Sequence, residues 1–184
     1  DSLFVPLKGE TDGHDYIQSA IKNGATAALW SRPESEAPDD IAIILVDDTL
    51  TALQDLAKYY LNEIKPKVVA ITGSNGKTTT KDMTAAVLNA KFNVHKTKGN
   101  YNNEIGLPFT ILEMPEETEI LVLEMGMSGP GEISFLTQLA TPDVAAITII
   151  GESHLEHLGS RRSIAKAKLE ILEGLQADGL FIYP

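Results

Sequence analysis

Seven consecutive residues near the middle of the chain combine glycine, lysine and hydroxyl side chains in the manner of a phosphate-binding loop. They are Gly73, Ser74, Asn75, Gly76, Lys77, Thr78 and Thr79. The apolar, β-branched run of residues 67–72 precedes them, so the predicted order is strand, glycine-rich turn and helix. The two glycines let backbone N–H groups approach a phosphate, and the helix directs its positive dipole end to the same place. Lys77 adds a positive charge, and Thr78 adds a hydroxyl suited to Mg²⁺.

This loop is shorter than the usual P-loop. The usual pattern places four residues between its first glycine and the Gly-Lys pair, whereas only Ser74 and Asn75 lie between Gly73 and Gly76. An ordinary turn is the alternative interpretation. A turn has no need for Lys77 at the first helical position, where its charge opposes the helix dipole, unless an anion binds there. We therefore predict a nucleotide site.

A carboxylate ends a second apolar strand. Residues 119–124 finish on Glu124, and the glycine-rich tract 125–131 follows directly. A carboxylate at the carboxyl end of a parallel strand, beside the strand of the phosphate loop, is placed to bind Mg²⁺. The alternative is a glutamate that merely faces solvent. The following glycines let a ligand approach and so favour the metal role.

Three other tracts carry polar side chains that suit ligand contact. Residues 98–108 are dense in amides, which form turns but also donate to nucleotides or substrates. His154 follows the apolar run 144–150 at the ligand edge of the sheet, although a lone histidine is more often structural. It lacks the flanking pattern of a zinc helix. Residues 8–15, with Lys8 and His14, suit either a polar ligand or a solvated loop.

Composition excludes several classes of protein. The chain of 184 residues carries a formal net charge of -11, which argues against a nucleic-acid or anionic-membrane partner. It has no cysteine, so disulfides, thiolate zinc sites and thiol nucleophiles are excluded, in keeping with a reducing compartment. No apolar stretch reaches the roughly 18 residues of a membrane span. We expect a cytoplasmic protein.

Strands and helices alternate along the chain. The predicted strands are residues 3–7, 25–30, 41–46, 67–72, 92–95, 119–124, 144–150 and 180–184, and the predicted helices are residues 16–23, 50–64, 79–90, 133–140 and 163–174. The uninterrupted apolar run 41–46 predicts a strand buried on both faces. In the helix of residues 79–90 we expect Met83, Val87 and Leu88 to face the core.

This alternation predicts an α/β fold with two domains. Residues 1–65 form a small α/β domain, and residues 66–184 form a P-loop-type central domain with a mostly parallel sheet, after a short linker at Pro66. The chain begins without a methionine or a signal pattern and closes on a strand that has just begun. We therefore expect it to be an excerpt of a longer protein.

The phosphate loop resembles that of the Mur ligases, the ATP-dependent amide ligases of peptidoglycan precursor synthesis. Four blocks are similar to the member of that family that joins D-alanyl-D-alanine to a UDP-linked tripeptide. They are residues 3–14, 98–108, 123–133 and 154–168. Such enzymes have a UDP-precursor domain, a central ATPase domain and a C-terminal Rossmann-like domain. The resemblance implies that this chain holds most of the first domain and part of the second, and that the third is absent.

The resemblance also implies roles for the residues around the phosphates. Gly76, Lys77 and Thr78 would hold the β- and γ-phosphates of ATP. Thr78 and Glu124 would bind Mg²⁺, and His154 would help to hold a second Mg²⁺. The cofactors implied are therefore ATP and Mg²⁺.

Further implied roles lie outside the loop. Asn103 would contact the nucleotide region, and Lys168 matches a lysine that some Mur ligases carry as a carbamate. Lys77, His154 and Lys168 are thus the expected catalytic residues. One position departs from the family, which usually has an asparagine where this chain has Ile149.

The implied reaction transfers the γ-phosphoryl group of ATP to the terminal carboxylate of UDP-N-acetylmuramoyl-tripeptide, and the amine of D-alanyl-D-alanine then attacks the acyl phosphate. The third residue of the tripeptide, lysine or diaminopimelate, stays open, and we expect a monomer. The alternatives are a ligase that adds the third residue, a folylpolyglutamate synthase, or a fragment that only binds nucleotide. A P-loop kinase or nucleotide switch is disfavoured because nothing resembles a kinase catalytic loop.

Overall fold

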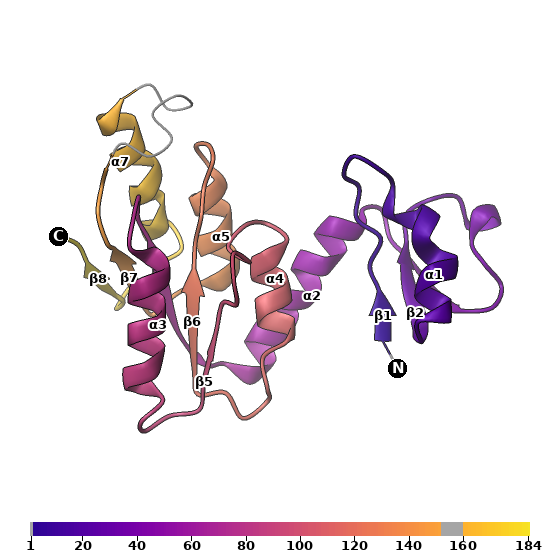
Figure 1. Cartoon of the computed structure of the whole chain (residues 1–184), viewed down its shortest axis with the longest axis horizontal. Coiled ribbons are helices and arrows are strands. Elements are labelled where there is room, and N and C mark those ends of the chain that lie inside the picture. Colours follow the sequence, from indigo (N-terminus) through magenta and orange to yellow (C-terminus); the bar gives the residue numbers. More distant parts are fainter. Residues whose placement is uncertain (1, 152–159) are drawn as a thin grey trace. The chain divides into compact units, whose positions relative to one another are not determined.

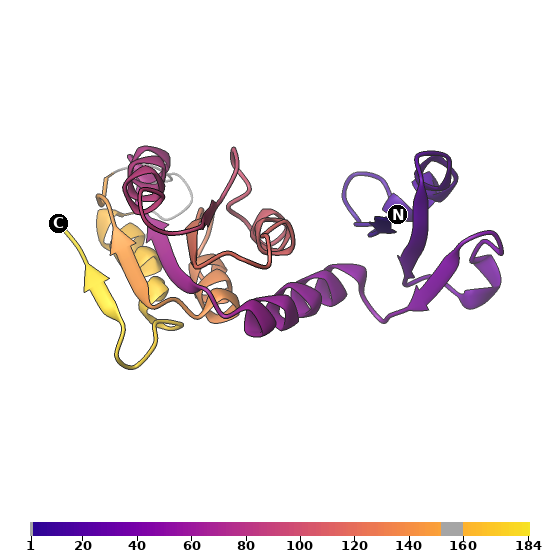
Figure 2. The ribbon, with the colours of Figure 1, turned by 90° about the horizontal axis from the view of Figure 1, so that it is seen from below.

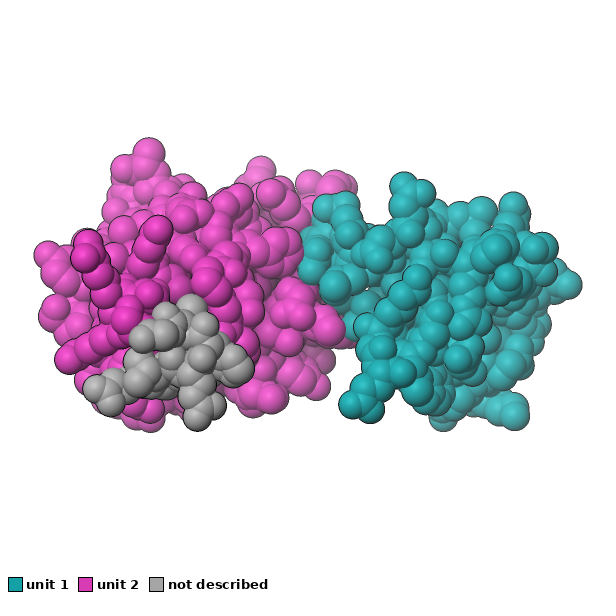
Figure 3. Space-filling model, turned by 90° about the horizontal axis from the view of Figure 1, so that it is seen from above, with its two compact units in different colours: residues 1–56 teal, residues 57–184 magenta. Residues whose placement is uncertain are grey.

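The computed structural model describes residues 2–151 and 160–184. The chain divides into two compact units, residues 1–56 and 57–184, which Figure 3 shows in different colours. The division falls within helix α2 (Thr49–Ile64), and the predicted boundary at residues 65 and 66 stays a prediction. None of the helices in the described ranges is long and apolar enough to cross a membrane.

Unit 1 is built on a three-stranded parallel sheet. Its strands, in the order β1-β2-β3, are β1 (Ser2–Phe4), β2 (Ala25–Trp30) and β3 (Ala42–Leu45). Two 3₁₀ helices and one α-helix connect them, namely η1 (Gly13–Tyr16), α1 (Ile17–Lys22) and η2 (Glu34–Glu36). Ile17, Ala28 and Trp30 form the small buried core. The predicted strand at residues 3–7 is shorter in the structure.

The prediction that residues 41–46 form a strand buried on both faces is wrong. Ile44 is 49% exposed and Leu45 is 51% exposed. Among the described residues β3 pairs only with β2, and it is therefore an edge strand of a small sheet. An apolar run predicts a strand, but it does not reveal how many neighbours cover that strand.

Unit 2 carries a five-stranded sheet in which every pair of neighbours is parallel (Figure 1). In spatial order its strands are β5 (Val94–Lys96), β6 (Ile120–Glu124), β4 (Lys67–Thr72), β7 (Val144–Ile147) and β8 (Leu180–Ile182). The register pairs Ile71 with Glu124 and Thr72 with Ile147. The carboxyl ends of β6, β4 and β7 therefore meet at one edge of the sheet, and this confirms the predicted α/β class with parallel strands.

Helices cover both faces of this sheet (Figure 2). They are α3 (Lys77–Leu88), α4 (Gly106–Leu112), α5 (Glu132–Ala140), α7 (Arg161–Leu169) and the 3₁₀ helix η3 (Glu170–Leu172). The main core lies on one face, where Leu107 of α4, Leu136 of α5 and Ile164 of α7 are buried against the strands. The smaller core under α3 includes Ile71 and Ala85.

The expected orientation of α3 is wrong in part. Met83 is 65% exposed and Val87 is 74% exposed. The side of α3 that faces the sheet carries Lys81, Ala85 and Leu88, which lie about one turn apart. Leu88 thus packs against the smaller core as predicted, whereas Met83 and Val87 lie outside the side of the helix that faces the sheet.

Candidate nucleotide and metal site

The phosphate loop connects β4 to α3, as the sequence predicts. Gly76 is the N-cap residue of α3 with a left-handed φ of 79°, and Gly73 has a φ of 153°. A Cβ atom on residue 73 would lie 1.9 Å from Oγ1 of Thr148, so only glycine fits there. Lys77 begins the helix and Thr79 lies in its first turn. The backbone of residues 73–79 thus has the form that an anion site at a helix N-terminus needs.

The chain segment after β7 holds this loop in place. Oγ1 of Thr148 donates to the carbonyl oxygen of Asn75 at 2.6 Å. The N–H of Ser74 donates to the carbonyl oxygen of Ile149 at 2.8 Å, and the N–H of Gly151 donates to Oγ of Ser74 at 2.9 Å. Ile149 contributes its backbone carbonyl, so this support does not depend on the side chain at the position where the family usually has asparagine.

Glu124 and Thr78 meet at the carboxyl ends of β6 and β4. Oγ1 of Thr78 donates to Oε2 of Glu124 at 2.8 Å, and Nδ2 of Asn102 donates to Oε1 of Glu124 at 2.8 Å. The N–H of Glu124 donates to Oγ1 of Thr97 at 3.0 Å. Glu124 is only 3% exposed. Each oxygen of the buried carboxylate therefore has its own donor, and the alternative of a solvent-facing glutamate does not describe this residue.

The donor set fits Mg²⁺ bound together with a nucleotide. Glu124 forms no ion pair with the lysine and arginine side chains of the described residues. Buried carboxylates are normally paired with a cation or a metal. Within residues 2–151 and 160–184, His, Asp and Glu side chains do not gather in groups of three or more that could hold a metal. Mg²⁺ typically takes one or two protein oxygens and completes its shell with phosphate and water, which Thr78 and Glu124 allow.

Two lysines are brought to the same edge of the sheet. Nζ of Lys77 donates to the carbonyl oxygen of Gly73 at 2.9 Å. Lys168 in α7 is 2% exposed, and its burial together with the charge of Lys77 lowers its pKa to about 8. Lys166, two residues earlier, is exposed, as its position on the helix predicts. Lys168 is therefore not part of a solvated helix face.

Two further predicted site residues are Asn103 and His154. Oδ1 of Asn103 accepts from the N–H of Gly106, the first residue of α4, at 2.9 Å, and a contact of Asn103 with nucleotide stays a prediction. His154 lies outside the described residues, and so does the predicted second metal contact.

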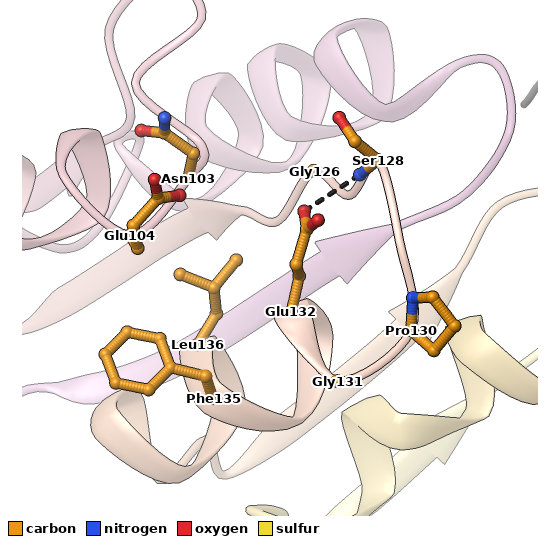
Figure 4. A pocket seen from close by; sticks show the side chains of 9 residues that line it. All are labelled: Asn103, Glu104, Gly126, Ser128, Pro130, Gly131, Glu132, Phe135 and Leu136. Atoms are coloured by element: carbon orange, nitrogen blue, oxygen red, sulfur yellow. Dashed lines mark hydrogen bonds between the residues drawn. The ribbon is translucent and has the colours of Figure 1, made fainter. Parts of the chain in front are cut away.

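A cavity of about 450 Å³ lies beside this edge (Figure 4). Its lining comprises Asn103, Glu104, Gly126, Ser128, Pro130, Gly131, Glu132, Phe135 and Leu136. The carboxylate of Glu132 accepts hydrogen bonds from the N–H groups of Ser128 and Gly129. These two bonds fix the loop between β6 and α5. Gly126 lies two residues after Glu124, so the cavity adjoins the candidate metal site.

In unit 1 the polar tract of residues 8–15 is bonded internally. The carboxylate of Asp12 accepts from the backbone N–H of His14, shares a hydrogen bond with Nδ1 of His14 and accepts from Nε of Arg32. These contacts hold the pKa of Asp12 well below its usual range. His14 is buried, and its Nε2 accepts from the N–H of Ser31. His14 and Asp12 therefore support the fold. A polar ligand at the other residues of the tract 8–15 stays a prediction.

Three residues that contact the site escaped the sequence analysis, namely Thr97, Asn102 and Thr148. Asn102 lies in the amide-rich tract of residues 98–108. The density of amides drew attention to the tract as a whole, but it did not distinguish Asn102 from its neighbours. The hydroxyl groups of Thr97 and Thr148 stand where a strand ends, and nothing in their spacing distinguishes them from other threonines.

Comparison with known proteins matches both parts of the chain. Residues 71–184 match the family described as Mur ligase middle domain, and residues 1–61 match the family described as Mur ligase family, catalytic domain. The UDP-N-acetylmuramoyl-tripeptide–D-alanyl-D-alanine ligase of Bacillus subtilis is 61% identical over 182 residues, which cover 98% of this chain and 40% of that protein.

Solved structures agree with this likeness. MurF from Acinetobacter baumannii superposes with a TM-score of 0.93 at 37% identity, covering 100% of this chain and 40% of that one. The MurF ligase from Thermotoga maritima in complex with ADP gives a TM-score of 0.89 at 40% identity, covering 99% of this chain and 42% of that one. The chain thus spans about 40% of the length of the curated relatives it matches. Because the middle-domain family matches more than half of its residues, this chain belongs to the Mur ligase family.

Proposed function

We propose that this chain is part of an ATP-dependent ligase that adds D-alanyl-D-alanine to UDP-N-acetylmuramoyl-tripeptide in peptidoglycan precursor synthesis. The observation that carries the proposal is the likeness, across nearly the whole chain, to relatives that bear this name. ADP in the Thermotoga maritima relative supports ATP as the nucleotide, and the pairing of Thr78 with Glu124 beside the phosphate loop supports Mg²⁺. A cytoplasmic monomer stays our expectation.

The reaction proceeds in two steps, phosphoryl transfer and then amide formation. A terminal carboxylate oxygen of the tripeptide attacks the γ-phosphorus of ATP, the bond to the bridging oxygen breaks, and ADP leaves. The amine of D-alanyl-D-alanine then attacks the acyl carbon, phosphate leaves, and the nitrogen loses a proton as the amide forms. Both steps need the reacting groups to be held in line and kept from water.

Residues of this chain supply the binding and the charge. The N–H groups of the loop, at the N-terminus of α3, donate hydrogen bonds to the phosphate oxygens, and Lys77 exchanges the carbonyl oxygen of Gly73 for a phosphate oxygen. Thr78 and Glu124 would hold Mg²⁺, which neutralises charge on the phosphoryl oxygens when it is bound. His154 remains the expected ligand of a second Mg²⁺.

Lys168 suits either of two roles in this scheme. As an ammonium group it would add positive charge beside the phosphates. With its pKa at about 8, roughly one amine in ten is uncharged at pH 7, and the uncharged amine is the form that reacts with CO₂ to give a carbamate. A carbamate would convert this buried cation into an anionic oxygen ligand.

The adjoining cavity is the proposed place for the peptide part of the substrate. It opens beside Gly126 and is lined both by apolar side chains, such as Phe135 and Leu136, and by polar groups, such as Asn103. A peptide bound there would have its terminal carboxylate near the phosphate loop. Asn103 would then contact the substrate or nucleotide through its amide nitrogen while Oδ1 accepts from the N–H of Gly106.

A coupled phosphate-release assay on the intact protein tests the proposal. With UDP-N-acetylmuramoyl-tripeptide and ATP present, D-alanyl-D-alanine should stimulate release and single amino acids should not. Tripeptides that end in lysine and in diaminopimelate are compared separately to identify the third residue. Stimulation by a single amino acid with a UDP-linked dipeptide would favour the ligase that adds the third residue, and stimulation by glutamate with a folate would favour a folylpolyglutamate synthase.

A further inference from the structure

We propose that Asn102 is a positioning residue that fixes the carboxylate of Glu124 in the orientation needed to bind Mg²⁺. The inference rests on the proposed function, because it gives Asn102 a role toward the metal site that Thr78 and Glu124 form. Asn102 was not among the residues expected from the sequence. Three separate contacts in the structure carry the inference.

The first contact holds one carboxylate oxygen. Nδ2 of Asn102 donates to Oε1 of Glu124 at 2.8 Å, while Oγ1 of Thr78 donates to Oε2 at 2.8 Å. Because the two oxygens are held by donors from two different segments, the carboxylate cannot rotate without losing one of these hydrogen bonds. Each oxygen retains a further lone pair, so the carboxylate stays able to accept a metal.

The second contact fixes the backbone that carries the amide. The carbonyl oxygen of Asn102 accepts from the N–H of Gly126 at 2.8 Å, and the N–H of Asn102 donates to the carbonyl oxygen of Asn100 at 2.8 Å. Upstream in the same segment, Oγ1 of Thr97 accepts from the N–H of Glu124 at 3.0 Å. The segment between β5 and α4 is therefore joined to the end of β6 both at Glu124 and two residues beyond it.

The third contact explains a glycine. A Cβ atom on Gly126 would lie 2.8 Å from Oδ1 and 2.9 Å from Cγ of Asn102. Gly126 is not among the residues with a positive φ, so its backbone conformation does not require glycine. The space beside it is instead filled by the amide of Asn102, which thus lies between Gly126 and the carboxylate of Glu124.

These contacts give Asn102 a function in preorganisation. Without the amide, Oε1 of a 3% exposed carboxylate would lose its donor, and the carboxylate would rotate or draw in water. Binding the metal would then require the carboxylate to be ordered first. Ligands held by a second layer of hydrogen bonds typically lose about 10- to 100-fold in metal affinity when that layer is removed.

The test compares ADP binding with and without Mg²⁺ in the intact protein, using a fluorescent ADP analogue in excess Mg²⁺ or in EDTA. The ratio of the two affinities measures how much the metal contributes. Asn102→Ala should lower this ratio about tenfold or more and leave the affinity in EDTA unchanged. A merely structural defect of the loop would weaken binding in both conditions. Thermal unfolding of each variant shows whether it is folded.

Matched variants separate the amide from its surroundings. Gly126→Ala should lower the ratio as Asn102→Ala does, because the new methyl group displaces the amide while the backbone hydrogen bond remains possible. Gly129→Ala, in the same loop, should leave the ratio unchanged, since its Cβ would meet only Oε1 of Glu132 at 3.4 Å. Asn100→Ala, an exposed neighbour of Asn102, should also leave it unchanged.

A double variant shows whether Asn102 acts through Glu124. In a protein that already carries Glu124→Gln, the further change Asn102→Ala should not lower the ratio again. An unchanged ratio in Asn102→Ala and Gly126→Ala, or equal further loss in the double variant, overturns the inference. If Glu124→Gln alone leaves the ratio unchanged, the proposed metal site itself is wrong, and that outcome is distinct from a failure of Asn102.

Discussion

Two ionisable side chains define the site at the scale of single residues. Glu124 is 3% exposed and Lys168 is 2% exposed, although charged side chains are almost never buried without a partner. Neither forms an ion pair within the described part of the chain. Such groups cost stability, and their burial at the phosphate loop is what the proposed function explains, because ligands of opposite charge would complete both sites.

The first prediction compares two lysines on α7. Lys168→Ala should reduce turnover of the intact protein on the order of 10²-fold or more, because a charged group beside the phosphates is lost. Lys166→Ala should stay close to the unaltered protein, since Lys166 is exposed. If Lys168 acts as a carbamate, short carboxylic acids should restore part of the lost activity. Equal and mild effects of the two substitutions would assign Lys168 no catalytic part.

The second prediction concerns pH and the stability of the 184-residue chain. The pKa of Lys168 is about 8 in the folded state against an ordinary value of 10.5, so between these pH values the unfolded chain binds more protons. The free energy of unfolding of the chain, relative to the Lys168→Ala variant, should therefore rise with pH through this window and be lowest below pH 8. Urea unfolding of the chain and of Lys168→Ala, in EDTA at pH 7 and at pH 9.5, measures the difference between their free energies of unfolding. A difference that falls with pH would contradict the burial of a cation.

At the scale of elements, β7 supports a loop that belongs to β4 and α3. Residues just after β7 supply the hydroxyl of Thr148 and the carbonyl oxygen of Ile149 to the loop. The loop is therefore shaped by a segment more than 70 residues away in the sequence. This arrangement follows from the strand order, in which β7 is the immediate neighbour of β4.

The third prediction tests this support. Thr148→Val removes the hydroxyl that donates to the carbonyl oxygen of Asn75 and should weaken ADP binding by about three- to tenfold, the usual effect of one neutral hydrogen bond. Thr148→Ser keeps the hydroxyl and should bind ADP almost normally. Titration with a fluorescent ADP analogue measures both variants. Equal affinities of the valine and serine variants would show that the hydroxyl does not shape the loop.

Elements were predictable to the extent that they follow local rules. The strand before the phosphate loop and the helix after it follow from β-branched residues, glycines and helical spacing; the strand has the predicted bounds, and the helix begins and ends two residues earlier than predicted. Helix α4 (Gly106–Leu112) was missed because it follows an amide-rich tract and contains Pro108, although proline is tolerated in the first turn of a helix. The donor that Asn102 gives to Glu124 was also missed, because it depends on how two distant segments meet.

At the scale of the whole molecule, the proposed site occupies one edge of one sheet, whereas the negative net charge belongs to the chain as a whole. The net charge of -11 would repel a nucleotide, so in the proposed site the affinity would come from the loop N–H groups and from Lys77 and Lys168 at one edge of one sheet. The sequence indicated this contrast through composition and motif. It did not indicate the exposure of Met83 and Val87, because the side of α3 that faces the sheet is decided by how the helix packs in the complete fold.

The last prediction separates binding from catalysis in the 184-residue chain. The phosphate loop, Thr78, Glu124 and Asn102 all belong to unit 2, and their contacts need no other part of the protein. The chain alone should therefore bind ADP with Mg²⁺, with heat released in calorimetric titration, and Lys77→Ala should weaken this binding. It should not ligate D-alanyl-D-alanine to the tripeptide, since it spans about 40% of the length of the relatives that bear that name. Ligation by the isolated chain would show that residues 1–184 already contain every group the reaction needs, and absence of ADP binding would show that the loop requires a partner domain to form its site.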